Sequence, residues 1–212
     1  MHTNQDIRPL HRIVVMNSVE VVSSVTADDL AKVTPCDGWN LADLLIHMTV
    51  QHRGFAAAAR GHGADAAVWQ LGTVAEAVAA DPAGSYAAAA HEVIDAFADA
   101  DVLDAAFALP EFGPGAVFPG AMAIGFHYVD YVVHGWDVAR TMGRSYQLPA
   151  DVVAAALPLA LLVPDGDFRT SDNAFFGPVL PSTDPTDDFD RILTHLGRSA
   201  HWTPAVVAGD PI

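Results

Sequence analysis

The chain has 212 residues, with 26 acidic and 10 basic side chains and a formal net charge of −16. Such a charge repels phosphate backbones and anionic lipid surfaces, so neither a nucleic acid nor a membrane is an expected partner. Its length suits one domain, 51% of its residues are hydrophobic, and no uncharged apolar run reaches the roughly 18 residues that indicate a membrane span. The single cysteine, Cys36, excludes an internal disulfide and, with no signal-peptide pattern at the N-terminus, predicts a cytoplasmic protein.

Hydrophobic spacing predicts a succession of helices with almost no strand. Asn40 is a favourable N-cap for the second helix, with Asp43 three residues later, and Pro119 and Gly143 frame the fourth helix. Breaks rich in Pro and Gly separate the helical segments. The expected helices span residues 7–25, 41–60, 86–101, 119–142, 150–162 and 188–197.

Four long helices joined by connections of mixed length predict an all-α fold, a four-helix bundle. We place the bundle in residues 1–145 and expect 146–212 to pack on it as an extension rather than to form an independent domain. The stretch 164–187 within that extension is rich in Pro, Asp, Ser and Thr. Such a stretch is typical of a lid or binding loop, and Phe168, Phe175 and Phe176 are its candidate anchors.

The fourth helix carries three polar residues on one face of an otherwise apolar surface. At about 100° per residue, His127, Asp130 and His134 fall within an arc of roughly 60°. Asp130 and His134 are four residues apart, close enough to bind one divalent ion together or, alternatively, to form a helix-stabilising hydrogen bond. His127 lies about two turns from His134 and is too distant to share the same ion.

The second helix contributes a further candidate ligand. His47 lies within its apolar stripe, either as a hydrogen-bonded core histidine or as a residue that faces Asp130 and His134 across the bundle core. His52 points about 140° away from His47 and is expected at the surface. His47, Asp130 and His134 would together leave coordination positions open for water or substrate, the pattern of a catalytic site. Their N, N and O donors suit Zn²⁺, and also Ni²⁺, Fe²⁺ or Co²⁺.

Three other polar residues have two readings each. His127 is a candidate general acid–base residue near the rim of the site, or else a hydrogen-bonded core histidine. Asp137 either accepts a hydrogen bond from a metal-bound histidine or forms an exposed pair with Arg140, and we favour the pair. Cys36 is a candidate nucleophile for which the sequence shows no basic partner.

Two ordered motifs resemble a known family. Residues 34–47 read TPCDGWNLADLLIH and residues 130–139 read DYVVHGWDVA, and both are similar to motifs of the DinB-like metal-binding proteins related to mycothiol-dependent maleylpyruvate isomerase. The ending DDFDRILTHLGR at 187–198 is similar to the close of the family's shorter members. The resemblance implies a DinB-like four-helix bundle with His47, Asp130 and His134 as its metal ligands.

The resemblance also implies a function, with two departures. The isomerase carries a further C-terminal domain that helps to hold its thiol, and its acidic ligand is a glutamate where this chain has Asp130. We expect a transferase or isomerase that depends on a divalent metal, with zinc as the first expectation, and on a thiol such as mycothiol, and that acts on a small electrophile. The alternative is a binding protein for a small molecule, or a cyclase-like biosynthetic enzyme, in which the metal is structural or absent. A small-molecule substrate is the expected partner, and a homodimer remains open.

Overall fold

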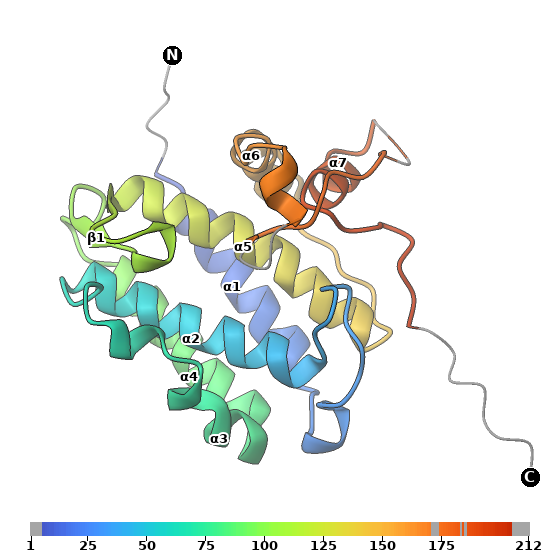
Figure 1. Ribbon diagram of the computed structural model, residues 1–212, viewed down its shortest axis with the longest axis horizontal. Coiled ribbons are helices and arrows are strands. Elements are labelled where there is room, and N and C mark those ends of the chain that lie inside the picture. Colours follow the sequence, from blue (N-terminus) through green and yellow to red (C-terminus); the bar gives the residue numbers. More distant parts are fainter. Residues whose placement is uncertain (1–5, 171–173, 183, 185, 205–212) are drawn as a thin grey trace, which may run out of the picture.

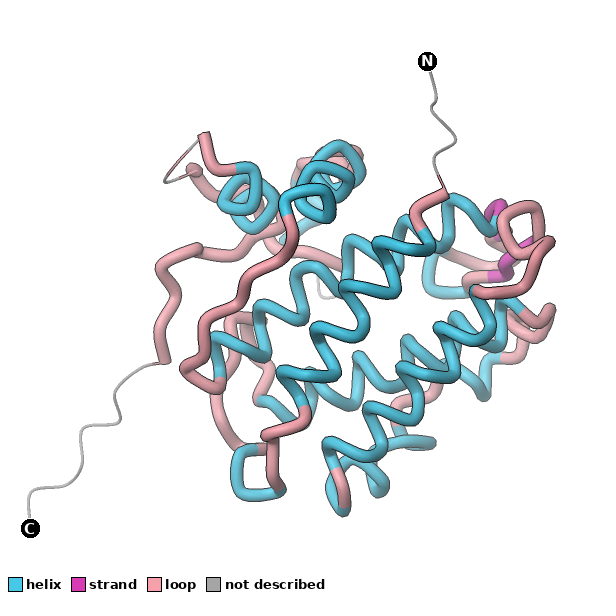
Figure 2. The backbone as a smooth tube through the Cα atoms, turned by 180° about the vertical axis from the view of Figure 1, so that it is seen from behind, coloured by secondary structure: helices cyan, strands magenta, loops and turns pink. Residues whose placement is uncertain are grey.

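A computed structural model describes residues 6–170, 174–182, 184 and 186–204, and confirms the all-α four-helix bundle. The bundle consists of α1 (Arg8–Val22), α2 (Leu41–Ala59), α4 (Pro82–Phe97) and α5 (Gly120–Thr141). Each helix packs against two neighbours, in the cyclic order α1, α4, α2, α5 (Figure 1). Seen from behind, helix dominates the described part of the chain (Figure 2).

Local sequence signals explain most of the helix ends. The Asn40 side chain accepts a hydrogen bond from the backbone N–H of Asp43 at 3.0 Å, and the Asp43 carboxylate accepts one from the N–H of Asn40 at 3.1 Å. This capping box begins α2 where the sequence predicts. Gly143 ends α5 with a φ of 67°, a left-handed conformation that glycine adopts without strain.

The connection between α2 and α5 differs from expectation in three places. The short helix expected in the Gly/Ala-rich region before residue 84 is α3 (Gly72–Ala80). The next helix, α4, begins at Pro82 rather than at 86 because the Asp81 side chain caps it at the N–H of Gly84. The same helix ends at Phe97, earlier than 101. The following segment forms a small antiparallel hairpin of β1 (Ala106–Ala108) and β2 (Val117–Pro119), with a 3₁₀ turn, η3 (Pro110–Phe112), between them.

The C-terminal segment packs on the bundle through α6 (Ala150–Ala160), which contacts α5 and α1 and in turn carries α7 (Asp188–His195). Figure 1 shows α6 and α7 side by side next to α5. The buried guanidinium of Arg169 donates hydrogen bonds to the carbonyls of Val163, Pro164 and Gly177, which ties down part of the stretch 164–187. The boundary between the bundle and its C-terminal extension at residue 145 stays a prediction.

The three candidate anchors of that stretch have different surroundings. Phe175 is 54% exposed and its ring lies 5.0 Å from that of Phe112. Phe176 packs against the main core. The side chain of Phe168 lies outside what the structure describes.

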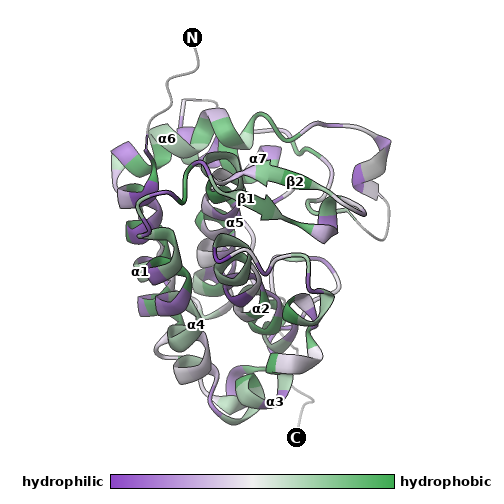
Figure 3. Ribbon diagram, turned by 90° about the vertical axis from the view of Figure 1, so that its left-hand side faces the viewer, coloured by the Kyte–Doolittle hydropathy of each residue, from purple (hydrophilic) through white to green (hydrophobic). Residues whose placement is uncertain are grey.

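Apolar side chains make up most of the buried core between the helices. Figure 3, coloured by hydropathy, shows hydrophobic and hydrophilic residues alternating along the helices. The expectation that His52 lies at the surface is wrong, because α2 packs against both α4 and α5 and this residue is fully buried. Nowhere in the described ranges is a helix both long and apolar enough to cross a bilayer.

Candidate metal centre

His47, Asp130 and His134 meet between α2 and α5. The Nε2 atom of His134 lies 3.3 Å from Asp130 Oδ1, and His47 Nε2 lies 3.9 Å from Asp130 Oδ2. One donor atom from each residue falls within 4.8 Å of the other two. The side chains of His47 and Asp130 are 24% and 23% exposed, so this face of the group is open to solvent. The structure therefore brings together the three ligands expected from sequence.

The protonation states of His47 and Asp130 fit a cation site, whereas His134 carries a proton that an ion would have to displace. Burial lowers the pKa of His47 to about 4, against the opposing effect of Asp130, so this imidazole is neutral and has a free lone pair at neutral pH. Burial raises the pKa of Asp130, but His134, His47 and Arg198 outweigh it and hold the group ionised. Burial likewise disfavours the charged form of His134, yet Asp130 and Asp137 raise its pKa well above 6.5.

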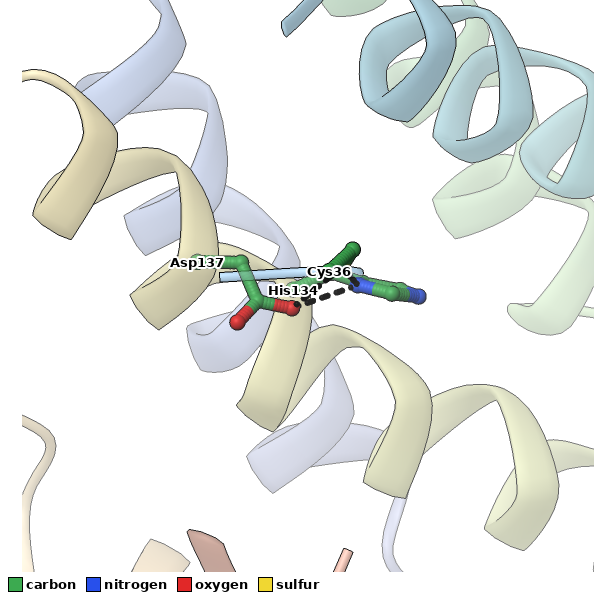
Figure 4. Close-up of side chains that lie close together, drawn as sticks. All are labelled: Cys36, His134 and Asp137. Atoms are coloured by element: carbon green, nitrogen blue, oxygen red, sulfur yellow. Dashed lines mark hydrogen bonds and ion pairs between the residues drawn. The ribbon is translucent and has the colours of Figure 1, made fainter. Parts of the chain in front are cut away.

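A second layer of side chains orients His134 from behind. Its Nδ1 atom lies 2.9 Å from Oδ2 of Asp137, whose side chain is fully buried, and this contact directs Nε2 towards Asp130 (Figure 4). The expected exposed pair of Asp137 with Arg140 is wrong. Arg140 instead donates to the carbonyl of Trp202 at 2.6 Å, and Asp137 faces the bundle interior.

Arg198 completes this layer, and sequence reasoning missed it. It follows α7 and is 6% exposed, and its Nη2 donates to Asp137 Oδ2 at 3.2 Å and to Cys36 Sγ at 3.2 Å. Because a buried carboxylate needs a compensating charge, this guanidinium allows Asp137 to stay ionised. The only sequence signal was the position of Arg198 at the end of the third motif.

Cys36 has polar partners that the sequence did not reveal. Its Sγ lies 3.2 Å from Asp137 Oδ2 and 3.9 Å from His134 Nδ1, and the three residues form a second group with donor atoms close together. In this group the carboxylate of Asp137 already forms an ion pair with Arg198. We therefore assign Cys36 to the hydrogen-bonded layer behind His134 rather than to the ligand set.

His127 does not reach the rim of the site. It is 1% exposed and lies in a chain of three buried imidazoles, with Nδ1 2.8 Å from His11 Nε2 and Nε2 3.2 Å from His52 Nδ1. The apolar ring of Phe97 lies beside it. These surroundings match the alternative of a hydrogen-bonded core histidine, and a catalytic role for His127 stays a prediction.

The comparisons with known proteins agree with the fold. The family model for the mycothiol maleylpyruvate isomerase N-terminal domain matches residues 13–139. Uncharacterised proteins from two strains of Mycobacterium tuberculosis are each 29% identical over 179 residues, which cover 84% of this chain and 90% of either relative. The crystal structure of the mycothiol-dependent maleylpyruvate isomerase is similar in fold, with a TM-score of 0.57 and 13% identity, and the match covers 83% of this chain and 75% of that one. Because the family model spans more than half of the chain and includes all three candidate ligands, the protein belongs to the mycothiol maleylpyruvate isomerase N-terminal domain family.

Proposed function

We propose that the protein binds one divalent metal ion through His47, Asp130 and His134, with zinc as the first candidate, and uses it for thiol-dependent transfer or isomerisation of a small electrophile. Mycothiol is the candidate thiol because of the family to which the chain belongs. The observation that carries the proposal is the convergence of two imidazoles and one carboxylate within 4.8 Å, with an open side.

The side chains fit the ion in charge as well as in donor type. Asp130 offsets part of the charge of the cation, and neutral His47 offers a nitrogen lone pair. Asp137 accepts a hydrogen bond from Nδ1–H of His134, so Nε2 is the atom that binds the ion once the ion displaces its proton. A bound ion lowers the pKa of a ligated thiol or water and so supplies a nucleophile near neutral pH.

The charges behind the ligands keep this arrangement fixed when a substrate enters. The positive charge of Arg198 compensates the negative charge of the Asp137 carboxylate, so this carboxylate stays ionised while it holds the His134 ring in place. Because this layer is buried, its hydrogen bonds do not compete with water. Substrate therefore meets His47 and Asp130 from the solvent side, while His134 is held from within.

Elemental analysis of protein purified without an affinity tag tests the metal part of the proposal. We expect about one divalent ion per chain, lost in His47→Ala and in His134→Ala but retained in His91→Ala, which changes an exposed histidine on α4. A full complement of ion in both ligand variants would contradict the assigned site.

Turnover of a model electrophile with and without a small thiol, and with and without chelator, tests the reaction. We expect turnover only when thiol and metal are both present. Tight binding of small molecules without thiol-dependent turnover would favour a binding protein, and turnover that chelator does not affect would favour a cyclase-like enzyme with a structural metal or none.

A further inference from the structure

The β1–β2 hairpin brings a carboxyl group to α2, the helix that carries His47. Glu111 lies in η3, between the two strands, and its Oε2 accepts a hydrogen bond from Gln51 Nε2 at 3.0 Å. Gln51 follows His47 by four residues on α2, so the two side chains are neighbours about 6 Å apart on the same helix face. Glu111 therefore hydrogen-bonds a side chain that lies about one helical turn from His47.

Aromatic packing fixes the hairpin in this position. The ring of Phe112 lies 5.1 Å from that of Phe126, 5.1 Å from that of Phe118 and 5.0 Å from that of Phe175. Phe126 precedes Asp130 by four residues on α5 and so lies about one helical turn from this ligand, as Gln51 does from His47 on α2. Residues of α2, α5 and the hairpin thus surround one position next to the candidate metal centre.

The chemistry of Glu111 suits proton transfer. Part of the residue is exposed and exchanges protons with solvent, while the protein around the carboxyl group desolvates it in part. Desolvation by the surrounding protein, with the negative charge of Asp130 adding to it, raises the pKa of Glu111 to about 7, although the hydrogen bond from Gln51 opposes this. From α5 the group also faces Tyr131, which burial keeps neutral. The hairpin, residues 106–119, holds no other titratable side chain.

We propose that Glu111 is the general acid–base residue of this site and exchanges a proton with a small substrate bound beside His47 and Asp130. This inference rests on the proposed function. When a thiol adds to an electron-poor double bond, the new S–C bond forms as the π electron pair moves onto the adjacent carbonyl oxygen. Protonated Glu111 donates its proton to that oxygen and is reprotonated from solvent, which replaces the proton released by the thiol.

The test compares the zinc-loaded full chain with Glu111→Gln, which keeps a side chain that can pair with Gln51 but cannot titrate. Glu92→Gln is the matched control, because Glu92 is an exposed acid on α4 that pairs with Arg60 at the C-terminal end of α2. The probes are N-acetylcysteine and 2-cyclohexen-1-one. We expect the wild type and the control to lose kcat/KM as pH rises through about 7. In Glu111→Gln, kcat/KM should no longer fall as the pH rises through about 7, and kcat should be about 10²–10⁴-fold lower than in the wild type. Its metal content and melting temperature should be unchanged.

Carbon-13 NMR titration of the Glu111 carboxyl provides a readout without turnover, with an expected midpoint near pH 7. A midpoint near the usual value for glutamate would overturn the inference, as would a Glu111→Gln variant with the rate and pH profile of the wild type. A lower rate with an unchanged profile would show that Glu111 only positions the hairpin, and would also overturn it. If the wild type shows no thiol-dependent turnover, the proposed function fails and the role of Glu111 fails with it.

Discussion

The three buried histidines make the stability of the fold sensitive to mild acid. His11, His127 and His52 form one hydrogen-bonded chain in the core. Burial lowers the pKa of His11 to about 3 and holds the pKa values of His52 and His127 well below 6.5. All three imidazoles are therefore neutral in the folded protein at pH values where they become charged in the unfolded chain.

The size of the effect follows from proton linkage. An unfolded histidine titrates near pH 6.5, so lowering the pH from 7.5 to 5.5 stabilises the unfolded state by about 1.4 kcal/mol for each histidine that stays neutral when folded. Three such residues give about 4 kcal/mol, a large part of the 5–15 kcal/mol of a typical domain. Because the folded pKa values are depressed, this stability is complete above pH 6.5 and is lost as the pH falls.

Urea unfolding of the metal-free protein at pH 7.5, 6.5 and 5.5 measures this loss. His47 and His134 shift in opposite directions and offset each other. The raised pKa of Glu111 stabilises the folded state as the pH falls and would hide part of the loss, so Glu111→Gln is the background for every measurement. His52→Phe, whose ring can stack on Tyr131 as His52 does, should reduce the pH-dependent loss by about 1.4 kcal/mol, whereas exposed His91→Gln should leave it unchanged. A wild-type loss below about 1.4 kcal/mol, or equal losses in the two variants, would refute the reasoning.

Three further predictions concern the candidate metal centre. Asp130→Asn removes the ligand charge, so the melting temperature should no longer rise with excess Zn²⁺, while the chelated protein keeps its fold. A retained rise would show that Asp130 is not a ligand. Asp137→Asn weakens the hydrogen bond that orients His134, and isothermal titration should show metal affinity lower by about 10–100-fold. The raised pKa of His134 means that the ion displaces a proton, so affinity should increase with pH, including above 6.5, and equal affinities at pH 5 and pH 8 would exclude histidine ligation.

The bundle could be predicted from the sequence because its signals are local. Helical periodicity in α1, α2 and α5 and the cap at Asn40 depend on residues within a few positions of one another. The start of α4 was misplaced because the cap of Asp81 lies in an alanine-rich stretch without clear periodicity. The hairpin before α5 was missed since its strands are only three residues long.

The candidate ligands could also be predicted, whereas the residues behind them could not. His47, Asp130 and His134 lie in two motifs with characteristic spacing. The burial of Asp137 depends on Arg198, 61 residues further along the chain, and no pattern around Asp137 announces that partner. His52 was misplaced for a related reason, because a helix that is covered on two sides buries polar residues that look peripheral on a helical wheel.

Arg198 also links the C-terminal segment to the metal centre. The side chains of Arg198 and Asp137 are 7% and 0% exposed, and they form an ion pair. Each charge therefore compensates the other inside the core. Removing one partner of such a buried pair typically costs about 3–5 kcal/mol, because the remaining charge is unpaired. A chain that ended after α5 would therefore lose packing from α6 and leave Asp137 with an uncompensated charge directly behind His134. The orientation of a candidate ligand in α5 thus depends on a residue of the C-terminal segment, as expected if this segment is an extension of the bundle rather than an independent domain.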